Sequence, residues 1–133
     1  MNAYDVMSVN IVAAKENATA IEIATRIVLG AFNGVPIIDN DGKVIGIVTT
    51  IDLLKAMSEG KRLDTMSAKE IMTSNPAVIN QDATVDEIID ILYRKRIDML
   101  PVLEEDGRLI GVVSRQDILM EKLNERFVTI DKK

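Results

Sequence analysis

The chain contains Gly46-Ile-Val-Thr-Thr-Ile-Asp52 and, 65 positions later, Gly111-Val-Val-Ser-Arg-Gln-Asp117. In both stretches a short apolar run ends at Thr or Ser, and an Asp follows three residues after that hydroxyl. A short apolar run bounded in this way is typical of a buried strand. A hydroxyl residue followed three positions later by an acid is typical of a helix start. The two stretches therefore predict a strand that passes directly into a helix at Thr49 and at Ser114.

An internal repeat extends this similarity across most of the chain. Residues 5–54 align with residues 70–119 without a gap, and 14 of these 50 pairs are identical. The identical pairs are Met7/Met72, Asn10/Asn75, Ala18/Ala83, Thr19/Thr84, Glu22/Glu87, Ile23/Ile88, Pro36/Pro101, Asp41/Asp106, Gly42/Gly107, Ile45/Ile110, Gly46/Gly111, Val48/Val113, Asp52/Asp117 and Leu54/Leu119. The period is longer than the units of common solenoid proteins. We interpret the sequence as a duplication and expect a pseudo-twofold pair of repeats.

Each repeat predicts the element order β-α-β-β-α, and with it an α/β (α+β) fold. The first helices are expected to start after Thr19 and Thr84, where a Glu three residues on completes a capping box, and to run to about residues 31 and 96. Asp41-Gly42 and Asp106-Gly107 supply tight turns between two strands. Second helices are expected from about residues 50 and 115. Extended segments and strands are expected at residues 11–14, 35–38 and 44–49, and at residues 77–79, 100–103 and 109–114.

Sequence changes between and after the repeats predict the domain boundaries. Gly60 is a helix stop, and Ser67-Ala-Lys-Glu70 has the spacing that caps a short helix. We expect a first repeat over residues 1–60, a linker over 61–66, a second repeat over 67–126 and a C-terminal tail over 127–133. Phe127-Val-Thr-Ile130 has strand character, and Phe127 is interpreted either as packing on its own domain or as an oligomer contact.

The composition excludes several classes of function. The 133 residues include no Cys, His or Trp, which excludes disulfides, zinc fingers, iron–sulfur centres and imidazole bases. With 16 basic and 21 acidic residues the net charge is −5, which argues against nucleic-acid binding. The sequence shows no catalytic constellation, glycine-rich phosphate loop, export signal or membrane span. We expect a cytoplasmic protein that is not an enzyme, has no metal site and does not bind membranes.

The pairs Thr49/Asp52 and Ser114/Asp117 allow two interpretations. One is structural, because the same spacing caps other helices of this chain. The other adds a ligand: a helix start offers free amides and a positive dipole end that suit phosphate, and an Asp one turn in can accept the two hydroxyls of a ribose. The two interpretations are compatible, so the spacing alone leaves both open.

Taken in order, the repeated motifs resemble those of the cystathionine β-synthase (CBS) domain family. Each copy has Met-Ser or Met-Thr near its start (Met7-Ser8 and Met72-Thr73), then an apolar-Pro-apolar strand, an Asp-Gly turn and Gly-x-x-Ser/Thr-x-x-Asp. The resemblance covers about residues 5–123 and is to a stand-alone tandem pair of CBS domains, called a Bateman module. It implies two pseudo-twofold-related β-α-β-β-α repeats packed through their sheets.

The resemblance also implies two clefts that bind adenosine-containing ligands such as AMP, ADP, ATP or S-adenosylmethionine. In similar modules the last Asp of the motif holds the ribose, the hydroxyl residue and its neighbours face the phosphate, and each cleft combines segments of both repeats. The first cleft would be lined by Ile47, Thr49, Thr50, Asp52, Pro76, Ala77, Ile97 and Asp98. The second cleft would be lined by Ile11, Val12, Phe32, Asn33, Val112, Ser114, Arg115 and Asp117.

Charged residues near the clefts refine this expectation. Before the strand proline, where nucleotide-binding relatives often have a basic residue, this chain has Asn33-Gly34 and Asp98-Met99. Asp98 would repel a phosphate, whereas Arg115 is the only basic residue inside either motif. We therefore expect the Asp117 cleft to be the main one, and AMP or ADP to be preferred over ATP. The basic cluster Arg94-Lys95-Arg96 is interpreted as complementing the dipole of its helix, or else as reaching an anionic ligand.

The resemblance implies a non-catalytic regulatory module that senses adenosine compounds and transmits their binding to a partner protein, whose identity the sequence does not give. No cofactor is required, and an adenosine nucleotide or S-adenosylmethionine is the regulatory ligand. Similar modules commonly dimerise through their helices, so a homodimer is expected. The alternative is a structural dimerisation module with empty or degenerate clefts. The paired Asp52 and Asp117 favour the sensor, and the lack of basic residues near Asn33 and Asp98 favours the alternative.

Overall fold

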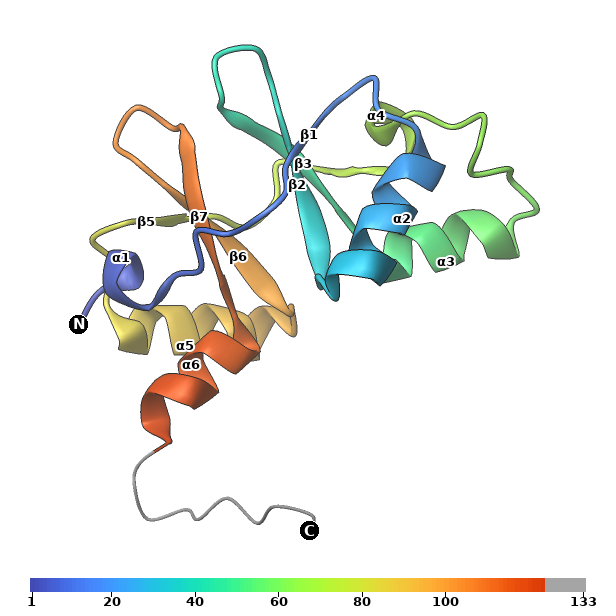
Figure 1. Ribbon diagram of the computed structural model, residues 1–133. Helices are drawn as coiled ribbons and strands as arrows, with labels where there is room; N and C mark the ends of the chain where they lie inside the picture. The colour runs from blue at the N-terminus through green and yellow to red at the C-terminus, as the bar shows by residue number, and fades with distance from the viewer. Residues whose placement is uncertain (124–133) are drawn as a thin grey trace, which may run out of the picture.

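The structure is a computed structural model that describes residues 1–123. It consists of two α+β halves with a sheet in each, and the two sheets meet at the centre of the molecule (Figure 1). This confirms the predicted fold class and the packing of the repeats through their sheets. The end of the predicted second repeat and the predicted strand at Phe127–Ile130, with the alternatives considered for Phe127, lie outside the described residues.

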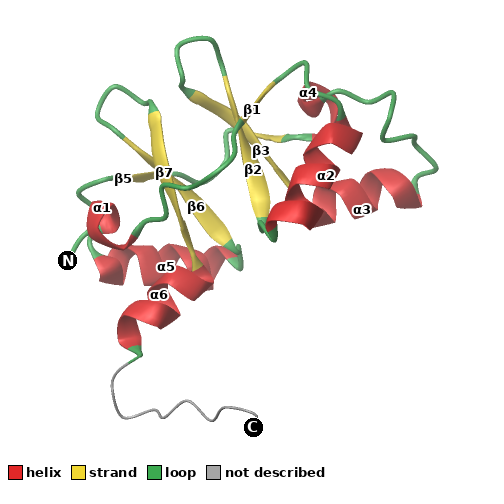
Figure 2. Ribbon diagram, in the orientation of Figure 1, coloured by secondary structure: helices red, strands yellow, loops and turns green. Residues whose placement is uncertain are grey.

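The first sheet has four strands in the order β1-β2-β3-β4, and the second has three in the order β5-β6-β7. In each sheet a short first strand runs parallel to the second, and the second and third form an antiparallel hairpin. Helices cover the outer face of each sheet (Figure 2). The elements are α1 (Ala3–Val6), β1 (Ala14–Lys15), α2 (Ala20–Gly30), β2 (Gly34–Ile38), β3 (Val44–Thr49), α3 (Thr50–Ser58), α4 (Ala68–Ile71), β4 (Thr73–Ser74), β5 (Ile79–Asn80), α5 (Val85–Lys95), β6 (Met99–Leu103), β7 (Leu109–Ser114) and α6 (Arg115–Lys122).

The starts of α2 and α5 have the hydroxyl half of the predicted capping boxes, but Glu22 and Glu87 do not accept the backbone N–H groups of Thr19 and Thr84 in return. The hydroxyls of Thr19 and Thr84 accept the backbone N–H groups three residues on, which satisfies donors that a helix start leaves free. Ala31 and Arg96 end α2 and α5 in the left-handed conformation, with φ of 53° and 52°. The parallel first strands are shorter than the extended segments predicted for them. Within residues 1–123, no helix has the length and apolar character needed to cross a membrane.

Two cores and a central contact hold the halves together. The first core lies between α2, α3 and the first sheet, and the second lies between α5, α6 and the second sheet. Equivalent residues occupy equivalent places, since Ile23 and Ile88 are both almost completely buried. A third cluster of Ile47, Met99 and Val112 joins the two sheets. The two copies of the repeated sequence therefore pack their cores in the same way.

The halves exchange their first segments. Helix α1 packs in the second core, where the Ala3 N–H donates to the Ala83 carbonyl at 2.8 Å, and the chain then crosses to β1 (Figure 1). Helix α4 packs in the first core, where the Ala68 N–H donates to the Ala18 carbonyl at 2.7 Å. Strand β4 likewise joins β3, and Ser8 bridges β7 at Val112. Each compact half is thus completed by residues of the other repeat, whereas the predicted boundaries 1–60 and 67–126 follow the sequence repeat alone.

The tips of the two hairpins meet beside the pseudo-twofold axis. Lys43 and Arg108 form an antiparallel bridge, and the Leu109 N–H donates to the Gly42 carbonyl at 3.0 Å. Gly42 and Gly107 have φ of +82° and +90°, a conformation that glycine adopts readily. The predicted Asp-Gly turns are therefore present, and the contact between them links the two halves.

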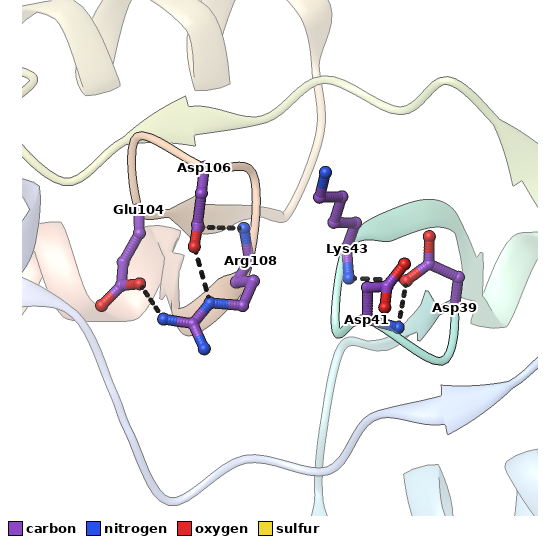
Figure 3. Close-up of polar contacts among 6 residues, drawn as sticks. All are labelled: Asp39, Asp41, Lys43, Glu104, Asp106 and Arg108. Atoms are coloured by element: carbon purple, nitrogen blue, oxygen red, sulfur yellow. Dashed lines mark hydrogen bonds and ion pairs between the residues drawn. The ribbon is translucent and has the colours of Figure 1, made fainter.

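The acidic side chains of the two turns form different hydrogen bonds and ion pairs (Figure 3). In the first, the Asp39 carboxylate accepts the N–H groups of Asp41 and Lys43 at 2.8 and 3.0 Å. In the second, Asp106 accepts the Arg108 N–H at 3.0 Å, and the Arg108 guanidinium pairs with Asp106 and Glu104, each at 2.8 Å. The backbone N–H of Lys43 is the main reason that the pKa of Asp39 lies below its usual value. The backbone N–H of Arg108 does the same to the pKa of Asp106.

Candidate functional site

Asp52 lies one turn into α3 and has a different partner at each carboxylate oxygen. Its Oδ2 accepts the Thr49 backbone N–H at 2.9 Å and the Thr49 hydroxyl at 3.0 Å. Within the described residues, its Oδ1 accepts only the hydroxyl of Thr73, at 3.4 Å. A carboxylate has about four lone-pair positions, so Oδ1 retains capacity to accept a further hydrogen bond.

Asp117 occupies the equivalent place in α6. Its Oδ2 accepts the Ser114 N–H at 2.8 Å, and its own N–H donates to the Ser114 hydroxyl at 3.1 Å. Its Oδ1 accepts the Ser8 hydroxyl at 3.0 Å. Both motifs therefore cap their helices, as the structural interpretation predicts. In both, the oxygen that does not serve the cap faces a hydroxyl from the exchanged segment.

A cleft of about 250 Å³ opens beside Asp52 between the two repeats. The eight residues predicted to line the first cleft all line this one. Strand β3 and helix α3 supply one wall, and residues 73–77 and 96–99 supply the other. Its full lining is Ile47, Thr49, Thr50, Ile51, Asp52, Thr73, Pro76, Ala77, Arg96, Ile97, Asp98 and Met99.

A second cleft of about 230 Å³ opens beside Asp117, with the repeats in exchanged roles. Seven of the eight residues predicted for it line it, and Arg115 does not. Ser8 and the segment from Gly30 to Asn33 form part of its wall. Its full lining is Ser8, Ile11, Val12, Gly30, Ala31, Phe32, Asn33, Gly34, Pro36, Met99, Val112, Ser114 and Asp117.

The side chain of Arg115 points away from the cleft for which it was predicted. Its Nε donates to the Ile97 carbonyl at 2.9 Å, and its terminal nitrogen lies 3.3 Å from Asp98 Oδ1. The cause is the register of the β6–β7 hairpin, which pairs Met99 with Ser114 and so places Asp98 next to Arg115. Arg115 lines neither cleft: it lines a groove on the α5–α6 face and touches the wall of the Asp52 cleft through Ile97 and Asp98. The reason for expecting the Asp117 cleft to be the main one is thereby removed.

Arg96 lines the Asp52 cleft although it was not among the residues predicted there. It ends α5 in the left-handed conformation, and its guanidinium carbon lies 5.9 Å from the centre of the Tyr93 ring. The signal in the sequence was the basic cluster at the end of this helix, for which an anionic ligand was one of two interpretations. The equivalent residue of the other repeat is Ala31, which lines the Asp117 cleft.

Comparisons with known proteins agree with this geometry. A family model described as the CBS domain matches the chain twice, over residues 3–59 and 68–124. The chain is 33% identical to the uncharacterized protein MK0525 of Methanopyrus kandleri, over 83% of this chain and 57% of that protein. It is 31% identical to L-aspartate semialdehyde sulfurtransferase of Methanocaldococcus jannaschii, over 86% of this chain and 22% of that enzyme. The chain thus spans little more than half of the first relative and under a quarter of the second.

Solved structures give the same result. The CBS domain pair of protein MJ0100, crystallised with 5′-methylthioadenosine and S-adenosyl-L-methionine, has a TM-score of 0.83 and 29% identity, covering 92% of this chain and 95% of that one. CBSX2, crystallised with AMP, shares the fold with a TM-score of 0.80 at 23% identity, covering 91% of this chain and 95% of that one. With the family model matched on both repeats, the chain belongs to the CBS domain family and carries two of its domains in tandem.

Proposed function

We propose that the protein is a non-catalytic regulatory module that binds adenosine-containing ligands in the Asp52 and Asp117 clefts. The observation that carries the proposal is the way the two carboxylate oxygens of each aspartate are hydrogen-bonded. Each uses one carboxylate oxygen for a helix cap and presents the other at a cleft built from both repeats. An anionic oxygen in that position is suited to accept hydrogen bonds from the hydroxyls of a ribose.

The relatives support adenosine as the shared part of the ligand. The structurally similar domain pair of MJ0100 was crystallised with two compounds that both contain adenosine. In this chain the aliphatic residues Ile47, Ala77 and Ile97 of one cleft, and Ile11, Val12 and Val112 of the other, offer apolar contact to an adenine ring.

The scarcity of positive charge at the clefts supports AMP or ADP in preference to ATP, because Arg96 is the only basic residue among the described residues that line them. A longer phosphate chain would extend out of the cleft, where solvent screens its charges.

Exposed apolar residues on the helices support a homodimer and a route to a partner protein. The α2–α3 face exposes Val28, Leu29, Ile51, Leu54 and Met57, and the α5–α6 face exposes Tyr93, Leu119, Met120 and Leu123. Large apolar side chains left exposed on neighbouring helices support an interaction surface there. Arg96 lines both the Asp52 cleft and a groove on the α5–α6 face, so a ligand that contacts Arg96 would alter that face. A sensor of adenosine compounds must share their compartment, and the proposal places it in the cytoplasm.

The same helix faces favour a second candidate function, a structural dimerisation module whose clefts bind nothing. The two candidates differ in their response to ligand. A sensor is stabilised by an adenosine compound because the ligand binds the folded state alone, whereas a purely structural module is not. The structural module is instead stabilised by self-association.

Thermal unfolding with adenosine, AMP, ADP, ATP and S-adenosylmethionine tests the proposal. A ligand at a hundred times its Kd adds about 2.7 kcal/mol, which raises Tm by several degrees for a domain of this size. We expect Asp52→Ala combined with Asp117→Ala to abolish the increase. Asp86→Ala is the matched control, because it removes an exposed acid from the first turn of α5 and lines neither cleft.

The opposite result would support the structural module. If no adenosine compound at millimolar concentration changes Tm, while Leu29→Asp converts a dimer to a monomer in sedimentation velocity, the sensor is excluded. Leu29 is 81% exposed, so this substitution does not disturb the core.

A further inference from the structure

The two clefts differ in charge, although their backbones are equivalent. Among the described residues that line the Asp117 cleft, Asp117 is the only one that is charged. The Asp52 cleft is lined by two acids, Asp52 and Asp98, and by Arg96. Arg115 does not line this cleft, but its guanidinium contacts the Asp98 carboxylate.

The Arg115 contact changes the electrostatics of the Asp52 cleft. Asp98 alone would repel a phosphate group, but its Oδ1 lies 3.3 Å from a terminal nitrogen of Arg115. The guanidinium Nε also donates to the Ile97 carbonyl at 2.9 Å, which holds the guanidinium beside Asp98. Attraction and repulsion between these two groups and an incoming anion therefore largely cancel.

Arg96 is then the charge that distinguishes this cleft. Within residues 1–123 it forms no ion pair, and its contact with the Tyr93 ring is a cation–π contact at an exposed site, which is a weak interaction. Its side chain can exchange that contact for a phosphate without leaving a partner charge unpaired. A guanidinium also matches a phosphate group with two parallel hydrogen bonds.

We propose that the Asp52 cleft takes adenosine compounds that carry a 5′-phosphate, and that the Asp117 cleft takes adenosine compounds without one. The second class includes neutral nucleosides and those with a positive charge, for which the lone Asp117 carboxylate is a favourable neighbour. This inference rests on the proposed function, since it assigns a ligand class to each of the clefts described there.

The repeat itself provides the matched exchange that tests the proposal. Arg96 and Ala31 are equivalent residues, both exposed and both left-handed, with φ of 52° and 53°. An arginine is already accommodated in this conformation at one of the two places, so Ala31→Arg places the same group at the Asp117 cleft. Arg94→Gln is the charge control, because Arg94 is near the same helix end, pairs with Asp90 and lines neither cleft.

The experiment is calorimetric titration of the full chain with AMP and with adenosine. We expect Asp52→Ala to abolish AMP binding and to leave adenosine binding at the Asp117 cleft. We expect Arg96→Gln to weaken AMP binding about tenfold, the loss of one charge-assisted contact, with no change for adenosine and no effect of Arg94→Gln. In the Asp52→Ala background, Ala31→Arg should restore measurable AMP binding, now at the Asp117 cleft.

Three results would overturn the inference while leaving the sensor in place. They are loss of AMP binding in Asp117→Ala but not in Asp52→Ala, equal effects of Arg96→Gln and Arg94→Gln on AMP, and binding of adenosine without any binding of AMP. If neither compound binds, the proposed function fails and this inference fails with it. The comparison of Arg96→Gln with Arg94→Gln, both at exposed residues, keeps the test valid if removal of a capping Asp unfolds the chain.

Discussion

The two repeats place equivalent aspartates at equivalent points of their two clefts, but the charged side chains around each aspartate differ. Asp52 and Asp117 each cap a helix with Oδ2 and face a hydroxyl with Oδ1. Around them, Arg96 in one repeat corresponds to Ala31 in the other. The backbone and the capping pattern therefore determine where a ligand can lie, whereas single exposed side chains determine which ligand charge is tolerated. Four predictions examine how far the equivalence of the repeats extends.

The largest expected effect is in the cores. Ile23→Ala and Ile88→Ala each remove a large side chain from equivalent places that are 2% and 0% exposed, and each should lower the free energy of unfolding by about 2–5 kcal/mol. Because each core contains a segment of the other repeat, both variants should unfold in one transition. Urea unfolding followed by circular dichroism measures this. Two separate transitions in either variant would mean that the halves are independent.

The next effect concerns the glycines where the exchanged segments cross the sheets. A Cβ at Gly46 or Gly111 would collide with the sulfur of Met72 or Met7, and would lie 3.0 Å from a backbone oxygen of Thr73 or Ser8. Gly46→Ala and Gly111→Ala should therefore each destabilise the fold by about 1–3 kcal/mol through overpacking. Thermal unfolding checks the two values. A neutral result at one site alone would show that its exchanged segment is more loosely held.

A smaller effect is expected at the caps, and here the repeats should differ. The Ser114 hydroxyl accepts the Asp117 N–H, so Ser114→Ala should cost about 1 kcal/mol. The Thr49 hydroxyl instead donates to Asp52 Oδ2, which already accepts the Thr49 backbone N–H. Thr49→Ala should therefore cost less than Ser114→Ala. Chemical unfolding of both variants under one condition measures the difference, and equal costs would contradict it.

The smallest effect is in the turns and depends on pH. The pKa of Asp39 is lowered in the folded state, chiefly by the Lys43 backbone N–H, and that of Asp106 chiefly by the Arg108 backbone N–H. A carboxyl with a lowered pKa stabilises the fold above its ordinary pKa of about 4, and this contribution is lost as pH falls through the folded value. The stability advantage of wild type over Asp39→Asn or Asp106→Asn should therefore be present at pH 7 and disappear near pH 2.

Tm measured from pH 7 to pH 2 follows this advantage, with Asp41→Asn as the control, since the backbone N–H groups of this turn donate to the Asp39 carboxylate. An advantage that persists unchanged at pH 2 would exclude ionisation as its source. Asp39 and Asp106 are not equivalent positions, because Asp39 precedes the pair Asp41-Gly42 whereas Asp106 belongs to the pair Asp106-Gly107. The pH dependence of each variant therefore reports on one turn alone.

Local signals predicted most of the fold, and the exceptions depend on the other repeat. Strands β3 and β7 have the predicted bounds, and helices α2 and α5 end where expected. Helix α1 and strand β4 were not predicted, because such short elements have no periodic pattern of their own. They are held by partners distant in the sequence, as Ala3 is by Ala83 and Thr73 by Ile47.

The lining of the clefts was predictable where the backbone determines it. Every residue expected at the Asp52 cleft lines it, since these residues belong to strands, caps and turns whose positions follow from the repeat. The direction of Arg115 was not predictable, because it depends on the hairpin register that places Asp98 within reach of its guanidinium. Arg96 is itself in the left-handed conformation, and it lies outside the repeated motif from which the cleft residues were predicted.

The exchange of first segments has a consequence for the order in which the protein can fold during synthesis. A ribosome delivers the N-terminus first, and many domains fold as soon as they emerge. Here the first half remains incomplete until Ala68 and its neighbours have emerged, and α1 has no place to dock until Ala83 and Val112 follow. Helix α1 is thus made before Ala83 and Val112 but docks only after them, so it stays without its native contacts while the residues between are synthesised.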